Sequence, residues 1–336
     1  MFEGFPHSSH PTGWFQFAWS AEISPGEVRP LRYFDRELVA YRGESGELHV
    51  LDAHCLHMGA HLGYGGSVER DCIRCPFHGW LWDGSGQNAE IPYGVRPNFI
   101  NLRTAAYPVE EIDGLALMWF SPSGAEPTWK PPSVLAPYLP SDFYDLFPHC
   151  TRQDQLRMVP QLIAENTIDF AHLKWVHRWE AGEPEILDFR ADGPRFTATM
   201  RGVLETPRGT AELRTTMNNW GVGLSTGHNI GLRPFVQVIS AIPVDSDTCD
   251  VRLSTFVTLP EGEAVDPSVP DKMANSIVRA QAREVLDEGA TGDRNIWGHM
   301  RYVPRPPLVA EEMDATKALR RWAGQFYEEP PTGKHV

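Results

Sequence analysis

Short runs of apolar, β-branched and aromatic residues dominate the first third of the chain. They cover residues 14–19, 31–34, 38–41, 48–51 and 115–120, and Gly, Asp and Ser residues separate them. Runs of this length, bounded by turn-forming residues, are typical of strands joined by tight turns. The pattern predicts a first domain that is mostly antiparallel β.

A stretch rich in Pro, Ser and Gly follows over residues 121–140 and has no periodic apolar face. Such a composition marks a connection rather than a helix or strand. We place the domain boundary there, with a first domain over 1–125, a linker over 126–140 and a second domain over 141–336.

The second domain mixes the two periodicities. Apolar residues at helical spacing predict helices over 159–173, 271–287 and 310–327, the second of them opened by Asp271. Alternating segments predict strands over 196–204, 235–244 and 251–259. The chain as a whole is therefore predicted to be α+β.

Composition narrows the class of protein. The 336 residues are enough for two cores, and 41% hydrophobic with 22% charged residues is ordinary for a globular protein. A formal net charge of −14 argues against nucleic acid as a partner and suits a protein partner with a basic patch. We find no signal-like start and no span of about 20 apolar residues, so we expect no membrane span and a cytoplasmic location.

The chain has five cysteines, an odd number that fits reduced thiols or metal ligands better than a disulfide framework. Cys150 and Cys249 lie far from other ligand types and are interpreted as ordinary thiols. Cys72 forms a Cys-x-x-Cys spacing with Cys75, but no βαβ pattern surrounds it, so we expect a strand residue near the ligands.

Two Cys/His pairs form the first candidate metal site. Cys55-Leu56-His57 is followed, after seventeen residues, by Cys75-Pro76-Phe77-His78. Two thiolates and two imidazoles can hold a [2Fe-2S] cluster, with the sulfurs on one iron and the nitrogens on the other. Zinc accepts the same four ligands. Glycines at 59, 63, 65, 66 and 79 favour close approach of the backbone to a cofactor, although tight turns also use them.

A second group of ligand types follows the linker, with Glu165, Asp169, His172 and His177 in one short stretch. Asp169 and His172 share a helical face, whereas His177 is rotated roughly 140° from His172. A common metal therefore requires the helix to end or loosen between the two histidines. Two His and one carboxylate are the ligands of many non-haem iron oxygenases, but such histidines are also frequent structural residues.

These motifs carry a family resemblance. Cys55-x-His57 with Cys75-Pro76-x-His78-Gly79-Trp80 resembles the Rieske signature, although Leu56 stands where Pro is common and His54 where an aromatic is common. Asn166-x-x-Asp169-x-x-His172-x4-His177 is similar to the mononuclear-iron motif of Rieske oxygenases.

The resemblance implies roles for these residues. The [2Fe-2S] cluster would be held by Cys55, His57, Cys75 and His78, and Fe(II) by His172, His177 and a distant carboxylate. Asp293, in Thr291-Gly292-Asp293, matches the family position best, ahead of Glu165, Glu284, Asp287 and Glu288, and its ordinary alternative is a turn or N-cap carboxylate. Asp169 would be a catalytic bridge between the iron-bound histidine and a cluster histidine of a neighbouring subunit, which implies a homotrimer.

The resemblance is closest to the group of 3-ketosteroid 9α-hydroxylases and cholesterol 7-desaturases. It rests on Ile91-Pro92-Tyr93, on residues 293–297 and on residues 320–327, whose ordinary readings are a turn, a core Trp297 and a Trp322–Phe326 helix pair. It implies a Rieske domain followed by a helix-grip-like catalytic domain with an antiparallel sheet and flanking helices.

The implied reaction uses O2 and electrons from NAD(P)H, delivered by a ferredoxin or a flavin/iron-sulfur reductase, to hydroxylate or desaturate an apolar, steroid-like substrate. We find no Gly-rich phosphate loop, so no nicotinamide or flavin site is expected in the chain itself. Three alternatives stay open: an oxygenase of smaller aromatic or other hydrophobic substrates, an iron-sulfur electron carrier, and a zinc-stabilised binding protein.

Overall fold

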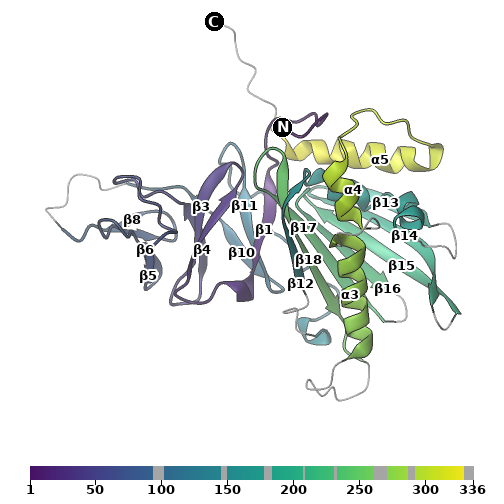
Figure 1. Cartoon of the computed structure of the whole chain (residues 1–336), viewed down its shortest axis with the longest axis horizontal. Helices are drawn as coiled ribbons and strands as arrows, with labels where there is room; N and C mark the ends of the chain where they lie inside the picture. The colour runs from purple at the N-terminus through teal and green to yellow at the C-terminus, as the bar shows by residue number, and fades with distance from the viewer. Residues whose placement is uncertain are drawn as a thin grey trace, which may run out of the picture. The chain divides into compact units, whose positions relative to one another are not determined.

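The structure is a computed structural model of the whole chain. It describes residues 1–93, 102–144, 150–177, 184–206, 209–230, 233–260, 271–286 and 292–328. The chain forms two compact units, one over Gln16–Phe120 and one that combines Met1–Phe15 with Ser121–Val336. Figure 1 labels the elements of both units, and the predicted α+β class is confirmed.

The unit over Gln16–Phe120 is built of small sheets. One has the order β2-β3-β4-β9, a second β5-β6-β7-β8, and a third β1-β11-β10. The ladders within the two four-stranded sheets are antiparallel. The strands are β1 (Gly13–Trp19), β2 (Val28–Tyr33), β3 (Arg36–Arg42), β4 (Leu48–Asp52), β5 (Ser67–Glu69), β6 (Cys72–Arg74), β7 (Leu81–Asp83), β8 (Asn88–Glu90), β9 (Ala106–Tyr107), β10 (Val109–Ile112) and β11 (Leu115–Phe120).

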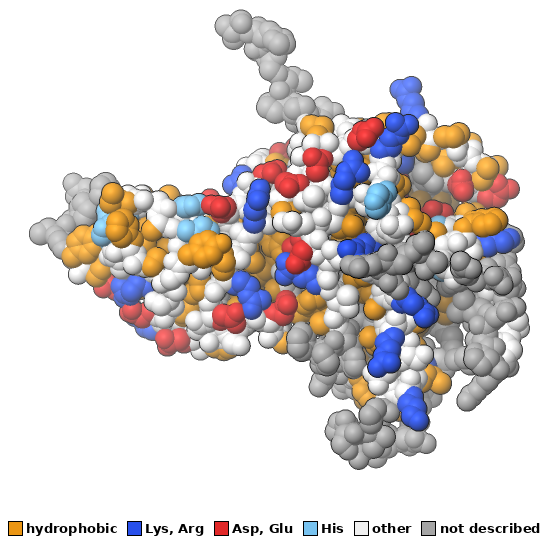
Figure 2. Space-filling view, in the orientation of Figure 1, with side chains coloured by type: hydrophobic (Ala, Val, Ile, Leu, Met, Phe, Trp, Pro, Cys, Tyr) orange, Lys and Arg blue, Asp and Glu red, His pale blue; other side chains and the backbone are white. Residues whose placement is uncertain are grey.

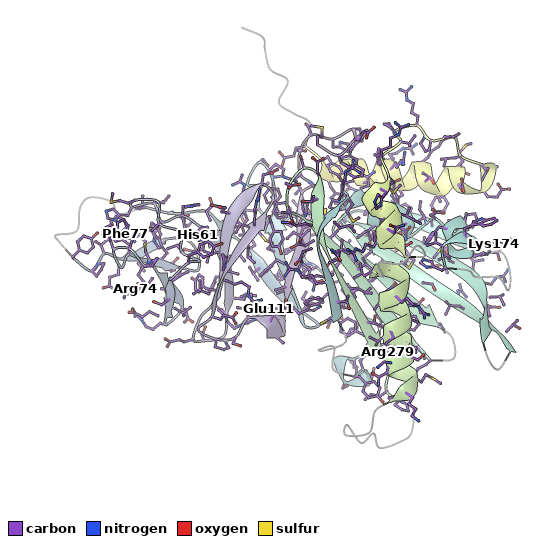
Figure 3. All side chains as sticks on the ribbon, viewed as in Figure 1. His61, Arg74, Phe77, Glu111, Lys174 and Arg279 are labelled. Carbon is purple, nitrogen blue, oxygen red and sulfur yellow. The ribbon has the colours of Figure 1, made fainter. Side chains whose placement is uncertain are left out.

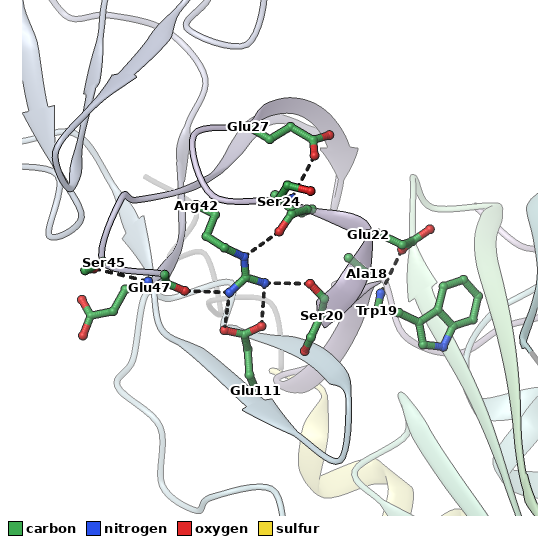
Figure 4. Close-up of polar contacts among 12 residues, drawn as sticks. Ala18, Trp19, Ser20, Glu22, Ser24, Glu27, Arg42, Ser45, Glu47 and Glu111 are labelled. Atoms are coloured by element: carbon green, nitrogen blue, oxygen red, sulfur yellow. Dashed lines mark hydrogen bonds and ion pairs between the residues drawn. The ribbon is translucent and has the colours of Figure 1, made fainter. Parts of the chain in front are cut away.

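A buried arginine ties three segments of this unit together. Arg42, at the end of β3, forms a two-pronged ion pair with Glu111 of β10, with distances of 2.7 and 2.9 Å (Figure 4). Its guanidinium also donates to the backbone oxygens of Ile23, Gly46 and Ser20 at 2.6 to 2.8 Å. Burial opposes the charge on Glu111, but the hydrogen bonds from Arg42 outweigh it and lower the pKa of that carboxyl.

The second unit contains a seven-stranded antiparallel sheet with the order β12-β18-β17-β16-β15-β14-β13. The sequence pattern identified β14, β17 and β18. It did not identify β12, β13, β15 or β16, and the run from Gly209 to Trp220 that forms β15 is too polar to alternate clearly. The strands are β12 (Cys150–Arg157), β13 (Glu185–Asp192), β14 (Arg195–Thr206), β15 (Gly209–Trp220), β16 (Leu224–Ile230), β17 (Phe235–Pro243) and β18 (Thr248–Val257).

The α-helices are α1 (Gln161–Asn166), α2 (Ala171–Trp175), α3 (Lys272–Leu286), α4 (Asp293–His299) and α5 (Ala310–Ala323), and short 3₁₀ helices cover Ser20–Glu22, Pro140–Asp142 and Gly324–Phe326. Figure 1 shows α3 lying across the sheet. Asp271 caps α3 as expected, because its Oδ1 accepts the backbone N–H groups of Met273 and Ala274 at 2.9 and 2.8 Å. Among the residues placed by the structure, none of the helices has the length and apolar character that a membrane crossing demands.

The prediction of one continuous helix over 159–173 was wrong. The helix stops after Asn166 and restarts at Ala171. The Thr167 hydroxyl donates to the carbonyl of Ala164 at 2.7 Å and accepts from Asn219 of β15 at 2.8 Å. A side chain that bonds both the helix end and the sheet gives the backbone an alternative to further helical turns.

The first fifteen residues belong to the second unit, although the sequence placed them with the first domain. The Phe2 side chain packs in a buried cluster with Leu156 and Met158, and its backbone N–H donates to Ser246 at 3.1 Å. The ring of Phe5 meets the ring of Tyr302 edge-on at 5.0 Å. Burial of these aromatic side chains, which spacing along the sequence does not reveal, fixes the segment there.

Candidate functional site

The two Cys/His loops have the same backbone design. The N–H of Gly59 donates to the carbonyl of Cys55 at 2.9 Å, and the N–H of Gly79 donates to that of Cys75 at 3.1 Å. Both glycines have φ near the left-handed region, 75° and 72°. The N–H of each cysteine bonds the residue five positions later, Ala60 or Trp80. Glycine is required at these two turns because a side chain there is strained.

The four side chains of these loops fit a metal cluster. Cys55 and Cys75 are buried, and both are free thiols. The Nδ1 atoms of His57 and His78 are buried and have no hydrogen-bond partner, and the two rings lie 4.6 Å apart. Burial raises the pKa of Cys55, so this thiol keeps its proton until a cation displaces it. Buried donors and acceptors without partners are costly, and metal bonds would satisfy both nitrogens.

The spacing of these ligands favours a cluster over a single zinc ion. Tetrahedral zinc brings its ligand atoms within about 4 Å of one another. In the part of the chain that the structure describes, only His172, His177 and Asp293 form a group of three or more candidate ligands within 4.8 Å. The ligand set of the two loops is therefore too open for one ion and suits a larger [2Fe-2S] unit.

Arg74, which the sequence did not single out, and Trp80 of the signature support the ligand loops. Arg74 on β6 donates to the carbonyl of Gly79 at 2.6 Å and forms ion pairs with Glu69 and Glu90. Trp80 stacks on the ring of His57 at 4.5 Å. Figure 3 labels Arg74 beside Phe77 at this end of the unit. Cys72 begins β6, as expected of a strand residue near the ligands.

His172, His177 and Asp293 converge although Asp293 follows His177 by 116 residues in the sequence. The Nε2 atom of His177 lies 3.5 Å from one carboxylate oxygen of Asp293, and Nε2 of His172 lies 3.9 Å from the other. All three side chains are largely buried, with 13%, 6% and 5% exposed. Two imidazoles and one carboxylate facing a common point form the donor set of a facial triad.

The local structure explains how these residues meet. His172 lies on α2, which ends at Trp175. His177 therefore lies beyond the helix, and its direction is not set by the helical rotation of roughly 140° from His172. Asp293 is the first residue of α4, after an extended Gly292. The sequence suggested an N-cap or turn as the ordinary role for Asp293, but its carboxylate is buried and directed at the histidines instead.

Asp169 connects this group with solvent. Its Oδ1 accepts the backbone N–H of His172 at 3.3 Å, its Oδ2 lies 3.7 Å from Nδ1 of His172, and the side chain is 49% exposed. Burial disfavours both charges, but the contact between the two residues prevails, so the pKa of Asp169 is lowered and that of His172 is raised. Asp169 thus orients His172 and remains reachable from outside.

The other carboxylates considered from sequence differ in position. Glu165 is held by Arg320 at 2.6 Å and accepts hydrogen bonds from Tyr302 and Gln161 at 3.1 and 2.9 Å. These contacts occupy its oxygens and leave it a structural role. The side chain of Glu284 is not described, and Asp287 and Glu288 lie outside the described residues.

Two cavities meet at the triad. One, of about 300 Å³, lies between α3 and the sheet and has a mainly apolar lining that includes Met200, Leu213 and Ile239. The other, of about 260 Å³, includes Asp169 and Arg320. Asn166, His172 and Asp293 line both, so the triad stands in the wall between them.

Comparison with known proteins gives the same division of the chain. Residues 13–108 match the Rieske [2Fe-2S] domain, and residues 118–327 match the 3-ketosteroid 9α-hydroxylase C-terminal domain. A probable 3-ketosteroid-9-alpha-monooxygenase, oxygenase component, of Rhodococcus rhodochrous is 30% identical over 96% of this chain and 82% of its own length. A cholesterol 7-desaturase of Ciona intestinalis is 27% identical over 95% and 69%.

Among solved structures, dicamba monooxygenase with non-heme iron and dicamba superposes with a TM-score of 0.63 at 19% identity, over 94% of this chain and 96% of that one. Fold and matched domains define a Rieske-type oxygenase. Within that class, the chain belongs to the 3-ketosteroid 9α-hydroxylase family. The expected cofactors, a [2Fe-2S] cluster and mononuclear iron, are confirmed by the matches to the Rieske domain and to the oxygenase component of Rhodococcus rhodochrous.

Proposed function

We propose that this chain is an oxygenase component that holds its cluster through Cys55, His57, Cys75 and His78 and its iron through His172, His177 and Asp293. The observation that carries the proposal is the convergence of the last three side chains at the wall of an apolar cavity. When bound, the cluster would supply electrons one at a time, and the iron would supply open coordination positions for O2 activation.

The chain's own residues give that chemistry its setting. Asp293 and the two imidazoles leave one side of the triad open to the cavity of about 300 Å³. The apolar lining excludes water from the substrate, and Asp169 fixes the orientation of His172. A cluster held there would receive electrons from NAD(P)H through a separate ferredoxin or flavin/iron-sulfur reductase, since the sequence carries no phosphate-binding loop of its own.

The substrate is proposed to be an apolar, steroid-like molecule that is hydroxylated or desaturated. Two observations support this: the family match over residues 118–327, and a cavity whose size lies at the lower end for pockets that enclose a small organic ligand. The relatives include both a monooxygenase and a desaturase. Identification of the product therefore distinguishes hydroxylation from desaturation.

The active assembly is proposed to be a homotrimer in which Asp169 faces a cluster histidine of the next subunit. Exposed apolar side chains crowd the cluster loops, namely Leu56, Met58, Tyr64, Phe77 and Tyr93. Figure 2 shows apolar side chains gathered over the end of the unit that carries β5, β6 and β8. A patch of this kind on a folded protein usually contacts a partner. A cytoplasmic location is also proposed, since all five cysteines are free thiols.

The experiment is metal analysis of anaerobically purified protein, with electron paramagnetic resonance of the reduced state. We expect about three irons and two sulfides per chain and a Rieske signal. Asp293→Asn and His177→Ala should each lose about one iron and keep the Rieske signal. Glu165→Gln is the matched control and should keep all three irons, because Glu165 is engaged by Arg320.

Turnover is tested with a separate reductase, NADH or NADPH, O2 and a set of 3-ketosteroids and sterols, with products identified by mass spectrometry. A Rieske signal with only two irons, unchanged in Asp293→Asn, would leave an electron carrier in place of the oxygenase. Zinc without sulfide would exclude the cluster altogether. Light scattering gives the assembly state, and a stable monomer that still turns over would contradict the trimer.

A further inference from the structure

A pair of glutamines spans the apolar cavity beside the triad. Gln237 lies on β17 and Gln281 on α3, and both line the cavity. The Nε2 of Gln237 donates to Oε1 of Gln281 at 2.5 Å. The hydrogen bond therefore joins helix to sheet across the space that a substrate would enter. Two amides in an apolar cavity are costly unless hydrogen bonds satisfy them, so their presence needs a reason.

Two other polar side chains of the cavity wall, Thr215 and Asn229, serve the sheet itself. The hydroxyl of Thr215 donates to Asn229 at 2.7 Å, and Asn229 donates to the backbone oxygen of Gly227 at 3.0 Å. The first bond connects the neighbouring strands β15 and β16, and the second lies within β16. The glutamine pair is different because its two members come from facing elements, where the space between them can open.

The pair has a definite place along the cavity. Met273, Ile277, Gln281 and Val285 are four residues apart and share one face of α3, with a rise of about 6 Å per step. Val285 packs with Trp297 in a buried cluster, next to the helix that begins with Asp293.

At the other end of α3, Met273 lines a separate cavity together with Pro234, which precedes the cavity residue Phe235 of β17. The amides thus lie between the outer end of α3 and the end near the triad. Arg279, labelled in Figure 3, is on the same helix but is exposed, which marks the opposite face.

The Gln237 carboxamide has hydrogen-bonding capacity left over. A primary amide offers two N–H donors and a carbonyl oxygen. Among the described residues, Gln237 uses one donor, toward Gln281. The second N–H can serve a ketone or hydroxyl oxygen of a ligand, and the carbonyl oxygen can accept from a hydroxyl.

We propose that Gln237 and Gln281 recognise a single ketone or hydroxyl oxygen on an elongated, otherwise apolar substrate and thereby decide which carbon faces the triad. The proposal rests on the proposed function, because it assumes that the substrate occupies this cavity. A site built to bond an oxygen rejects an analogue without it, since the second N–H of Gln237 then stays desolvated and without an acceptor. The glutamines are specificity residues and take no part in the chemical step.

The test compares Gln237→Met and Gln281→Met, which keep side-chain length and remove the amide, with wild type. The matched control is Gln153→Met, on β12, whose amide bonds the backbone of Asp154. Dissociation constants are measured anaerobically by calorimetry for a ketosteroid, the corresponding hydroxysteroid and analogues from which each oxygen in turn is removed. Products are assayed in parallel for the position oxidised.

We expect wild type and Gln153→Met to prefer one oxygenated ligand over its deoxy analogue by roughly tenfold, and each cavity variant to lose most of that ratio. The cavity variants should also oxidise more than one carbon. In the double variant Gln237→Met with Gln281→Met, the preference for the oxygenated ligand should fall no further than in either single variant, because the two amides act as a unit.

Cavity variants that bind and oxidise steroids with the wild-type ratio at a single carbon would overturn this inference and leave the proposed function intact. If wild type binds no steroid while its three irons are present, the steroid part of the proposed function fails and this inference fails with it. Folding of each variant is checked by the Rieske spectrum and circular dichroism.

Discussion

Replacing Arg42 by Met should destabilise the Rieske unit more than any exposed arginine substitution in the same strand. Arg42 is 10% exposed and makes five hydrogen bonds, two of them to Glu111, which is 31% exposed (Figure 4). Removing one partner of a buried ion pair costs about 3–5 kcal/mol. Because Glu111 is partly exposed, the ion pair alone should cost about 3 kcal/mol. Three backbone carbonyls also lose a donor, so we expect a total loss of about 4 kcal/mol in the free energy of unfolding.

The magnitude can be apportioned with further variants. Arg42→Lys keeps the charge but loses the planar fork, and should cost about 2 kcal/mol. In Arg42→Met with Glu111→Gln, no uncompensated charge remains, so part of the loss should be recovered. Arg36→Met, on the exposed part of β3, is the matched control and should change stability by at most about 0.5 kcal/mol.

The assay is urea unfolding followed by two probes. Visible absorption of the cluster reports the Rieske unit, and far-ultraviolet circular dichroism reports both units. For Arg42→Met, the transition seen by the cluster should move to lower urea with an unchanged slope. A loss below about 1 kcal/mol, or one equal to that of Arg36→Met, would refute the view that Arg42 holds these segments together.

Three further outcomes are expected. Burial alone would raise the pKa of Asp271. Hydrogen bonds from the Ala274 backbone, Tyr144 and Arg233 outweigh burial and lower this pKa to about 2. Its stabilisation is therefore present above pH 4 or so and lost as pH falls toward about 2, and Asp271→Asn should remove that part of the acid dependence in urea melts at pH 3 and 7. Gly66→Ala should weaken cluster retention, measured as sulfide per chain, because a Cβ there would lie 2.1 Å from the carbonyl oxygen of Leu62; unaltered sulfide content would argue against it. Cys72→Ser should keep the Rieske signal, whereas Cys75→Ser should abolish it, and loss of the signal in both would make Cys72 a ligand.

The ligand motifs could be read from the sequence because each of their parts is local. Cys55 and His57, or Cys75 and His78, lie within one turn, so their spacing carries the chemistry. The longer strands β1, β2, β3, β4 and β11 of the first unit were also readable, because such runs between turn residues need only local pairing, whereas the short strands β5 to β10 were not predicted. The helix ends were less certain: the stop at Asn166 depends on Thr167 and on Asn219, 52 residues further along.

The tertiary structure decided which residues far apart in the sequence come into contact. Asp293 reaches the histidines because α3 and α4 fold back onto the sheet, whereas the carboxylate of Glu165 is held by Arg320 and Tyr302. Sequence alone ranked these carboxylates through family resemblance. The cavity and the Gln237–Gln281 pair had no signal in the sequence at all, since strand and helix residues become its wall only after packing. Residue type and spacing thus determined the chemistry, and long-range burial decided which groups of the right type meet.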